Sequence, residues 1–225
     1  MSTALVIGAS RGLGFEFTRQ YLADGWRVFG TWRAEPDRVR LRDAGAQTLR
    51  LDVNDASDLA GIGWQLDGER IDVIVMNAGV YGPRTSHPRR PPTEPEFDLV
   101  MRTNVLAALR LLPIVTPLAV ATGGTLAFVS SRMGSLTETA ASYGALYRVS
   151  KAAVNMVSRL AHVELAPQGA RVVTLHPGWV RTDMGGPNAD VDVADSVAGQ
   201  RRVIADRAGH PSGGFYDWRG QPVAW

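Results

Sequence analysis

The sequence predicts an α/β protein, in which helices cover both faces of a mostly parallel β-sheet. Short apolar runs with the composition of buried strands alternate along the chain with longer segments of helical period. The run "IDVIVMNAG" at 71–79 is almost continuously apolar, which is typical of a strand buried on both faces. Alternation of this kind indicates βαβ units. The length of 225 residues fits one large domain or two small ones, and we take 1–225 as a single domain.

Each element has its own sequence signal. Strands are expected at residues 4–10, 27–33, 46–53, 71–79, 125–134 and 170–178, where the apolar runs have strand length. Helices are expected at residues 12–25, 36–45, 55–66, 96–115 and 143–164. Gly25 is a stop signal for the first helix, and Asp55 or Ser57 can cap the third. Thr93 and Glu96 have the spacing of a capping box before the fourth.

Two segments break this alternation. The segment 81–97 holds five prolines and four basic residues, so we expect a solvated loop and place an anion-binding surface second. The segment 182–209 begins as a loop rich in glycine and proline and ends with a helical pattern. An insertion at this place in the chain is expected to form a substrate loop or lid over a ligand.

The composition excludes several classes of function. The chain has no cysteine, and His87, His162, His176 and His210 are not spaced as metal ligands, so no metal site is expected. The formal net charge of +2 shows no nucleic-acid footprint. We expect no membrane span, because Arg110, Pro113, Pro117 and the Gly123–Gly124 pair interrupt the longest apolar stretches. The start of the chain lacks the features of a signal peptide, and a cytoplasmic location is expected.

A glycine-rich turn follows the first strand and opens the first helix. Its residues are Gly8, Ser10, Arg11, Gly12, Leu13 and Gly14, in the order G-x-x-x-G-x-G. Glycine permits the tight turn and lets the backbone come close to a pyrophosphate, while the helix N-terminus offers N–H groups and a partial positive charge. In this position between strand and helix, the pattern predicts a dinucleotide site of the Rossmann kind.

The spacing of the glycines resembles that of the short-chain dehydrogenase/reductase family. The family's other motifs are matched in order by "MNAG" at 76–79, "TNV" at 103–105, "VSSRMG" at 129–134, Tyr147-x-x-x-Lys151 and "HPGWVRTDM" at 176–184. Met76 departs from the family's usual asparagine. The wording of several motifs is most similar to the C-factor-like and sniffer-like carbonyl reductases. The resemblance implies a doubly wound, seven-stranded sheet of order 3-2-1-4-5-6-7.

Lys151 is the only lysine beside 23 arginines. Lysine carries a compact point charge and arginine a broad fork, so either this position needs a small ammonium or one lysine remains by chance. Tyr147 lies four residues earlier, on the same face of a helix. A nearby cation lowers the pKa of a tyrosine, ordinarily about 10, and makes it a workable general acid for a carbonyl oxygen. The resemblance adds that the Lys151 ammonium holds the ribose hydroxyls of the nicotinamide.

Two further catalytic residues come from the resemblance. Ser131 is implied to hydrogen-bond the substrate carbonyl, and strand alternation allows only one of Ser130 and Ser131 to face the site. Asn104 is implied to sit at a helix distortion that holds a water between Asn104 and Lys151. The alternative for Asn104 is a helical polar residue with a local bond only.

The end of the second strand bears on the choice of cofactor. Arg33 at the strand end and Arg11 in the glycine loop can bind the 2′-phosphate of NADP(H), whereas Glu35 and Asp37 are the rival acids that would suit NAD(H). We expect NADP(H). The resemblance implies further cofactor contacts from Asp52, Val53, Asn77, Ala78, Gly79, Tyr147, Lys151, Pro177, Gly178, Val180 and Thr182.

The leading hypothesis is an NADPH-dependent reductase of ketones or aldehydes. The residues Met133, Tyr143, Trp179 and Met184 suggest a substrate pocket that is apolar and partly aromatic. The rival hypotheses are a cofactor-binding signalling protein of the C-factor kind and an NAD-dependent alcohol dehydrogenase. The resemblance also implies a homodimer or homotetramer, although related proteins include less aggregated forms.

Overall fold

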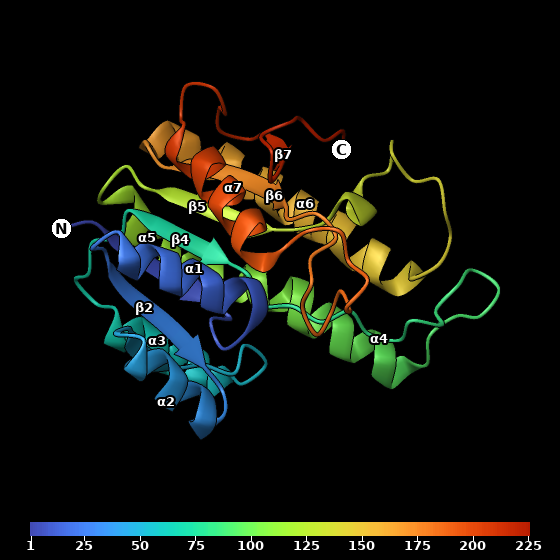
Figure 1. The fold of residues 1–225 in the computed structure, drawn as a ribbon, viewed down its shortest axis with the longest axis horizontal. Coiled ribbons are helices and arrows are strands. Elements are labelled where there is room, and N and C mark those ends of the chain that lie inside the picture. Colours follow the sequence, from blue (N-terminus) through green and yellow to red (C-terminus); the bar gives the residue numbers. More distant parts are fainter.

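The fold is built on one seven-stranded sheet in which every neighbouring pair of strands is parallel. A computed structural model describes residues 1–225. The strands are β1 (Thr3–Ile7), β2 (Arg27–Trp32), β3 (Gln47–Arg50), β4 (Val73–Met76), β5 (Thr125–Val129), β6 (Arg171–His176) and β7 (Phe215–Asp217). Their order is β3-β2-β1-β4-β5-β6-β7, which confirms the order that the family resemblance implies (Figure 1).

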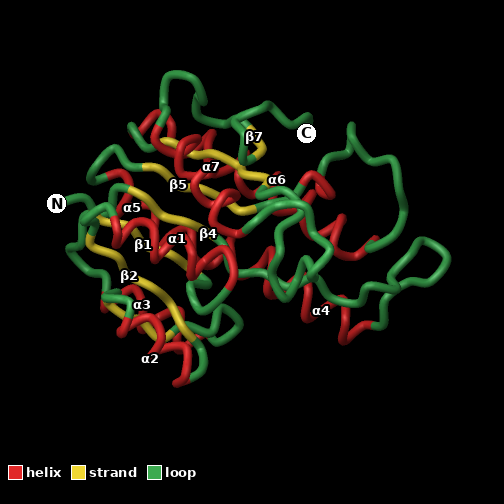
Figure 2. Tube along the Cα trace, in the orientation of Figure 1, coloured by secondary structure: helices red, strands yellow, loops and turns green.

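Helices cover both faces of this sheet, as the alternation of apolar runs predicts. They are α1 (Gly12–Ala23), α2 (Glu35–Asp43), α3 (Ala56–Gln65), α4 (Glu94–Met101), α5 (Ala107–Val120), α6 (Ala145–Leu165) and α7 (Val193–Ala205), with a π-helical turn at Arg102–Leu106 and 3-10 turns at Arg132–Gly134 and Ala166–Gln168. Helices α3, α5 and α6 pack on one face, and α1, α2 and α7 pack on the other (Figure 2).

The core consists of two hydrophobic layers separated by the sheet. Successive residues of a strand point to opposite faces. In β1, Leu5 and Ile7 therefore enter the layer under α3, α5 and α6, whereas Ala4 and Val6 enter the layer under α1 and α7. All four side chains are fully buried. The central strands are apolar on both faces for this reason, and their carboxyl ends open on a single edge.

The predicted helix caps are confirmed. Asp55 precedes α3, and its carboxylate accepts hydrogen bonds from the N–H groups of Ser57 at 2.7 Å and Asp58 at 3.1 Å. Thr93 precedes α4, and its N–H donates to the Glu96 carboxylate at 2.8 Å. Both caps satisfy polar groups that a helix N-terminus would otherwise leave without a partner.

The expectation of no membrane span stays a prediction. The continuous helix Glu94–Val120 is long and apolar enough, by length and composition, to cross a membrane. Its most apolar window is 44% buried inside the protein, and Leu111, Val115 and Ala119 of α5 lie in the core. The packing of α5 on the sheet accounts for this apolar character.

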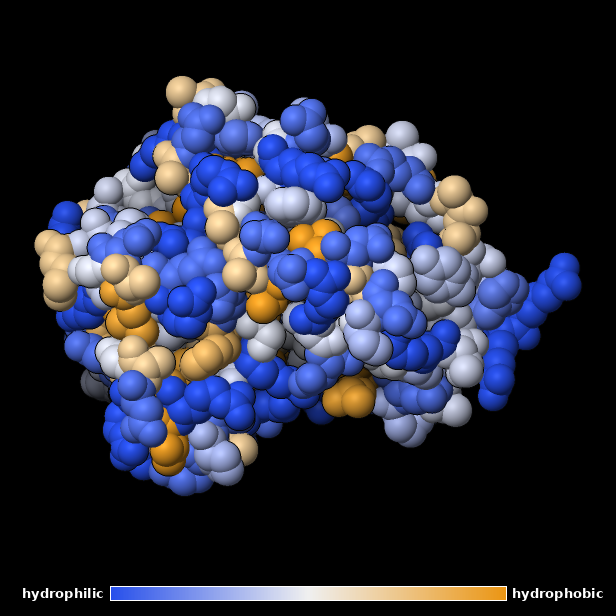
Figure 3. All heavy atoms as spheres, in the orientation of Figure 1, coloured by the Kyte–Doolittle hydropathy of each residue, from blue (hydrophilic) through white to orange (hydrophobic).

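The segment 81–97 is mostly exposed, as its composition predicts, but it is attached to the body of the protein at Ser86. Ser86 is buried, its carbonyl accepts the Ala145 N–H at 3.1 Å, and its hydroxyl accepts the Leu146 N–H at 3.2 Å. These bonds attach the loop to the start of α6. Only the turn at 87–90 projects away from the body of the molecule, where hydrophilic side chains extend at the right of Figure 3.

Candidate active site

The glycine loop packs tightly between β1 and α1. Gly8 and Gly12 have φ of +82° and +53°, in the left-handed region that favours glycine. A Cβ on Gly14 would lie 2.0 Å from the Gly8 carbonyl oxygen, so no side chain fits at Gly14. Helix α1 starts at Gly12 with no acidic residue in its first turn and no side-chain cap. Its first N–H groups are thus directed toward the carboxyl edge of the sheet without an internal partner.

The segment after β4 is brought against this loop. The side-chain amide of Asn77 donates to the Gly8 carbonyl at 2.9 Å. A Cβ on Gly8 would lie 2.8 Å from the Ala78 Cα, and a Cβ on Gly79 would lie 3.7 Å from the Lys151 Nζ. Residues predicted from two separate motifs therefore form one continuous wall, which leads from the glycine loop to the lysine.

Asn104 lies in the π-helical turn between α4 and α5, which confirms the predicted helix distortion. Its side chain accepts the Val80 N–H at 2.8 Å, and its Nδ2 donates to the Val80 carbonyl at 2.9 Å and to the Ser150 hydroxyl at 2.9 Å. Asn104 thus joins the segment after β4 to helix α6. Ser150 was not predicted, because it is an ordinary helical serine in the sequence.

Ser130 and Ser131 face opposite sides, as strand alternation requires. The Ser130 hydroxyl is directed into the protein and donates to the Asn155 side chain at 2.5 Å. The Ser131 hydroxyl accepts the Met133 N–H at 3.1 Å and interacts with Tyr147. The structure therefore brings Ser131, rather than Ser130, to the tyrosine.

Tyr147 and Lys151 are both buried on the inner face of α6. The Lys151 Nζ donates to the Val129 carbonyl at 2.9 Å and lies 5.6 Å from the centre of the Tyr147 ring. Burial raises the pKa of Tyr147 well above its ordinary value, which the interaction with Ser131 only partly offsets. Burial also lowers the pKa of Lys151 to about 8. The expected lowering of the Tyr147 pKa by Lys151 is therefore wrong for this arrangement, because burial dominates and the Lys151 ammonium is bonded to the Val129 carbonyl.

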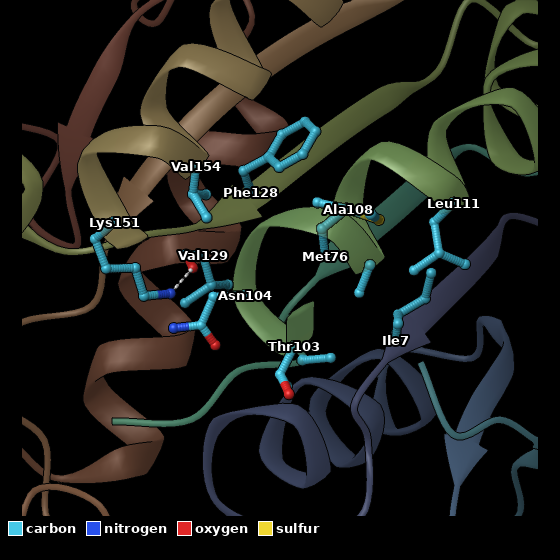
Figure 4. A pocket seen from close by; sticks show the side chains of 12 residues that line it. Ile7, Met76, Thr103, Asn104, Ala108, Leu111, Phe128, Val129, Lys151 and Val154 are labelled. Atoms are coloured by element: carbon cyan, nitrogen blue, oxygen red, sulfur yellow. Dashed lines mark hydrogen bonds between the residues drawn. The ribbon is translucent and has the colours of Figure 1, made fainter. Parts of the chain in front are cut away.

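A small cavity lies beneath Asn104 and Lys151. Its volume is about 20 Å³, and Figure 4 shows Asn104 beside the ammonium of Lys151, which is directed at the Val129 carbonyl. The lining residues are Ile7, Met76, Ala78, Thr103, Asn104, Ala107, Ala108, Leu111, Phe128, Val129, Lys151 and Val154. This volume suits a single water molecule, and three of the lining side chains are polar. The cavity lies where the family resemblance implies a bound water.

Tyr81 is a site residue that the sequence analysis missed. Its ring stacks on the Tyr147 ring with a centroid distance of 4.5 Å and an interplanar angle of 16°. The Arg84 guanidinium also lies over the Tyr81 ring, 4.9 Å from its centre. The available signal was the position of Tyr81, two residues after the "NAG" that ends the fourth strand. The proline content of the following loop hid that signal.

The four predicted pocket residues differ in exposure. Met133 is half-buried, and its methyl group lies 3.2 Å from where a Cβ on Gly144 would be. Tyr143, Trp179 and Met184 are exposed by 59%, 52% and 39%, so they line the rim of the site rather than its base.

The end of β2 carries more arginines than the sequence analysis used. Arg33 is exposed directly after the strand. The rival acid Glu35 is in the first turn of α2 and pairs with Arg38 at 2.8 Å. Arg40 donates to the Ser10 carbonyl at 3.0 Å, which fixes the glycine loop from outside. Arg38 and Arg40 are thus two further cations near the end of β2 and the glycine loop, and neither was predicted.

Further cofactor candidates lie at the ends of β3 and β6. Asp52 accepts the Asn54 N–H at 2.9 Å beside the buried Val53. Gly178 has φ of +88° next to the indole of Trp218. Pro177 accepts the Ser196 hydroxyl of α7 at 2.6 Å, so α7 holds the segment after β6.

The segment that follows β6 crosses the glycine loop. The methyl group of Thr182 lies 3.3 Å from where a Cβ on Gly12 would be, and Asp183 pairs with Arg11 at 2.9 Å. Val180 is buried and bridges Val191. The role of this segment as a lid stays a prediction.

His176 ends β6 beside this segment. Burial lowers its pKa to about 4, so the imidazole is neutral at pH 7 and is not poised as a general base.

Comparison with known proteins agrees with this arrangement. The sequence profile of the short chain dehydrogenase family matches residues 2–191. C-signal of Myxococcus xanthus is 40% identical over 159 residues, which cover 69% of this chain and 93% of that protein. A short-chain dehydrogenase/reductase of Burkholderia multivorans, solved with bound NADP, is 31% identical, with a TM-score of 0.92 over 100% of this chain and 99% of the other. The carbonyl reductase Sniffer of D. melanogaster is 26% identical, with a TM-score of 0.90 over 100% of both chains. These likenesses, together with the sheet order and the residues gathered at its carboxyl edge, show that the chain belongs to the short-chain dehydrogenase/reductase family of oxidoreductases.

Proposed function

We propose that the chain is an NADPH-dependent carbonyl reductase, in which a ketone or aldehyde gains a hydride at carbon and a proton from Tyr147 at oxygen. The observation that carries this proposal is the burial of Tyr147 beside Ser131 and Lys151, at the sheet edge where the glycine loop opens. Burying an ammonium without a carboxylate partner is costly. Such a cost is expected where a buried charge has a function, whereas a lysine with only a structural role would not need to be buried without a partner.

The residues at the sheet edge fit a dinucleotide. The absence of side chains at Gly8 and Gly14 lets the loop form a tight turn, so that its backbone can lie close to a pyrophosphate. The uncapped start of α1 offers N–H donors to the same group. When bound, NADPH would supply the hydride. Lys151 would hold the ribose hydroxyls of the nicotinamide half.

The proton is the contribution of the protein. Ser131 would donate a hydrogen bond to the substrate carbonyl oxygen, and Tyr147 would transfer its proton to that oxygen as charge develops. Burial keeps this proton on Tyr147 at neutral pH, which is the state that a general acid requires. Asn104 and a water in the adjoining cavity would return a proton to Tyr147 past Lys151.

Carbonyl turnover with NADPH tests the proposal directly. We expect NADPH oxidation that depends on added quinones, diketones or aromatic aldehydes, because Met133, Tyr81 and the rim residue Tyr143 make the site apolar and aromatic. Tight NADPH binding without turnover on any carbonyl would contradict the proposal and favour a signalling role of the C-signal kind. Alcohol oxidation with NAD as the preferred cofactor would favour the dehydrogenase.

The preference for NADPH is proposed to depend on Arg33. Replacing Arg33 by Gln should lower kcat/KM for NADPH about tenfold or more and leave kcat/KM for NADH nearly unchanged, because only NADPH carries the 2′-phosphate. Steady-state kinetics with both cofactors measure this. Arg70→Gln, at the opposite edge of the sheet, is the matched control for loss of one charge. An equal loss with both cofactors would refute the role of Arg33.

A further inference from the structure

Two arginines stand at the rim of the site, each held over a tyrosine ring. The Arg84 guanidinium lies 4.9 Å from the centre of Tyr81, whose other partner in the stack is Tyr147. The Arg148 guanidinium lies 5.1 Å from the centre of Tyr143. Arg148 also follows Tyr147 directly in the chain. Stacking on an aromatic face restricts a guanidinium and leaves its N–H groups directed sideways.

Neither guanidinium is paired with a carboxylate. Arg84 donates to the Met184 carbonyl, and Arg148 donates through Nε to the Tyr143 carbonyl at 2.9 Å, so each keeps further N–H donors. The acids on the neighbouring loops are already engaged. Asp183 pairs with Arg11 at 2.9 Å, and the Glu138 carboxylate pairs with Arg132 at 2.9 Å.

The two tyrosines that carry these charges are neighbours, since the Tyr81 hydroxyl lies 2.5 Å from where a Cβ on Gly144, the residue after Tyr143, would be. Arg84 and Arg148 both favour the ionised form of Tyr81 and so act to lower its pKa, against the larger effect of burial. Arg148 is in the first turn of α6, where a cation opposes the helix dipole and no acidic residue compensates it. The fold therefore gives no structural reason for a second unpaired cation beside the catalytic tyrosine.

We propose that Arg84 and Arg148 bind a carboxylate carried by the substrate, so that the preferred substrates are apolar or aromatic carbonyl compounds with an anionic end. The planar fork of arginine matches a carboxylate with two parallel hydrogen bonds. The stacked tyrosines would contact the apolar part between the carboxylate and the reacting carbonyl. This inference rests on the proposed reductase function, since it assigns the substrate class of that site.

The test compares 4-formylbenzoate with its neutral methyl ester as substrates of NADPH oxidation. The two aldehydes differ in intrinsic reactivity, so the ratio of their kcat/KM values is compared between variants. Arg84→Gln and Arg148→Gln should each lower the ratio of carboxylate to ester about fivefold or more. Arg84→Lys and Arg148→Lys keep a cation and should keep most of the preference. Arg70→Gln removes the same charge far from the site and should leave the ratio unchanged.

Ionic strength provides an independent reading. Salt shortens the range of attraction between exposed charges, so the wild-type ratio should fall as salt rises and the ratio of Arg84→Gln should respond less. The inference is contradicted if both Gln variants reduce the ester and their carboxylate-to-ester ratio of kcat/KM stays within about twofold of the wild-type ratio. If wild type reduces no carbonyl compound, neutral or anionic, it is the reductase proposal itself that fails.

Discussion

Replacing Tyr147 by Phe is expected to lower kcat for carbonyl reduction by a factor of about 100 to 10,000, the usual contribution of a positioned general acid. The change removes one hydroxyl and leaves a ring that still stacks on Tyr81 at the same place. Because the substitution keeps the stacked ring and removes only a neutral hydroxyl and its interaction with Ser131, we expect the free energy of unfolding to change by no more than about 1 kcal/mol. NADPH binding should also persist, so the loss should fall on kcat rather than on the affinity for the cofactor.

Single-turnover and steady-state NADPH oxidation measure this loss, and fluorescence titration measures binding of the cofactor. Tyr143→Phe is the matched control, since Tyr143 lies just before the start of α6 and is 59% exposed. We expect it to keep kcat within about threefold of wild type. Comparable rates in wild type and Tyr147→Phe would remove the general-acid role, and a loss in both variants would point to the shape of the rim instead.

The sequence allowed prediction of features set by local chemistry. The glycine loop and the Asp55 cap each follow from a few neighbouring residues. Strand alternation predicts that only one of Ser130 and Ser131 faces the site, and the family resemblance selects Ser131. The helix distortion at Asn104 came from family resemblance, and the structure gives its physical basis in three side-chain hydrogen bonds. Residues whose role depends on their own backbone geometry were therefore within reach.

Features that depend on contacts between distant loops were not within reach. Tyr81 reaches Tyr147 across 66 positions of the chain, and the loop that carries it is attached to α6 through Ser86. The pairing of Arg11 with Asp183 joins segments that are 172 positions apart. The direction of the Tyr147 pKa shift was wrong for a related reason. The spacing places a lysine on the same helical face as Tyr147, whereas the degree of burial that raises the Tyr147 pKa is a property of the whole fold.

Two substitutions of Lys151 separate its proposed catalytic role from its cost to the fold. Lys151→Arg keeps a positive charge but places a broad guanidinium where the ammonium contacts the Val129 carbonyl and borders a cavity of about 20 Å³. We expect this variant to fold and to lose most of its turnover, because a broad guanidinium cannot replace the compact ammonium that is proposed to hold the ribose beside Tyr147. Near-wild-type NADPH oxidation by Lys151→Arg would show that any cation suffices.

Lys151→Met removes the charge and is expected to abolish turnover while making the protein more stable. Lowering the Lys151 pKa from 10.5 to about 8 means that the buried ammonium disfavours the folded state by about 3 kcal/mol at neutral pH. Loss of the bond to the Val129 carbonyl should offset about 1 kcal/mol of the gain.

The energetic cost of the buried Lys151 ammonium is full below pH 8 and disappears as the pH rises to about 10.5. The stability advantage of Lys151→Met over wild type should shrink over the same interval, which denaturant unfolding at several pH values measures. A Met variant that is less stable than wild type at pH 7 would show that Lys151 is kept for the fold, whereas a more stable and inactive one shows that it is kept for the reaction.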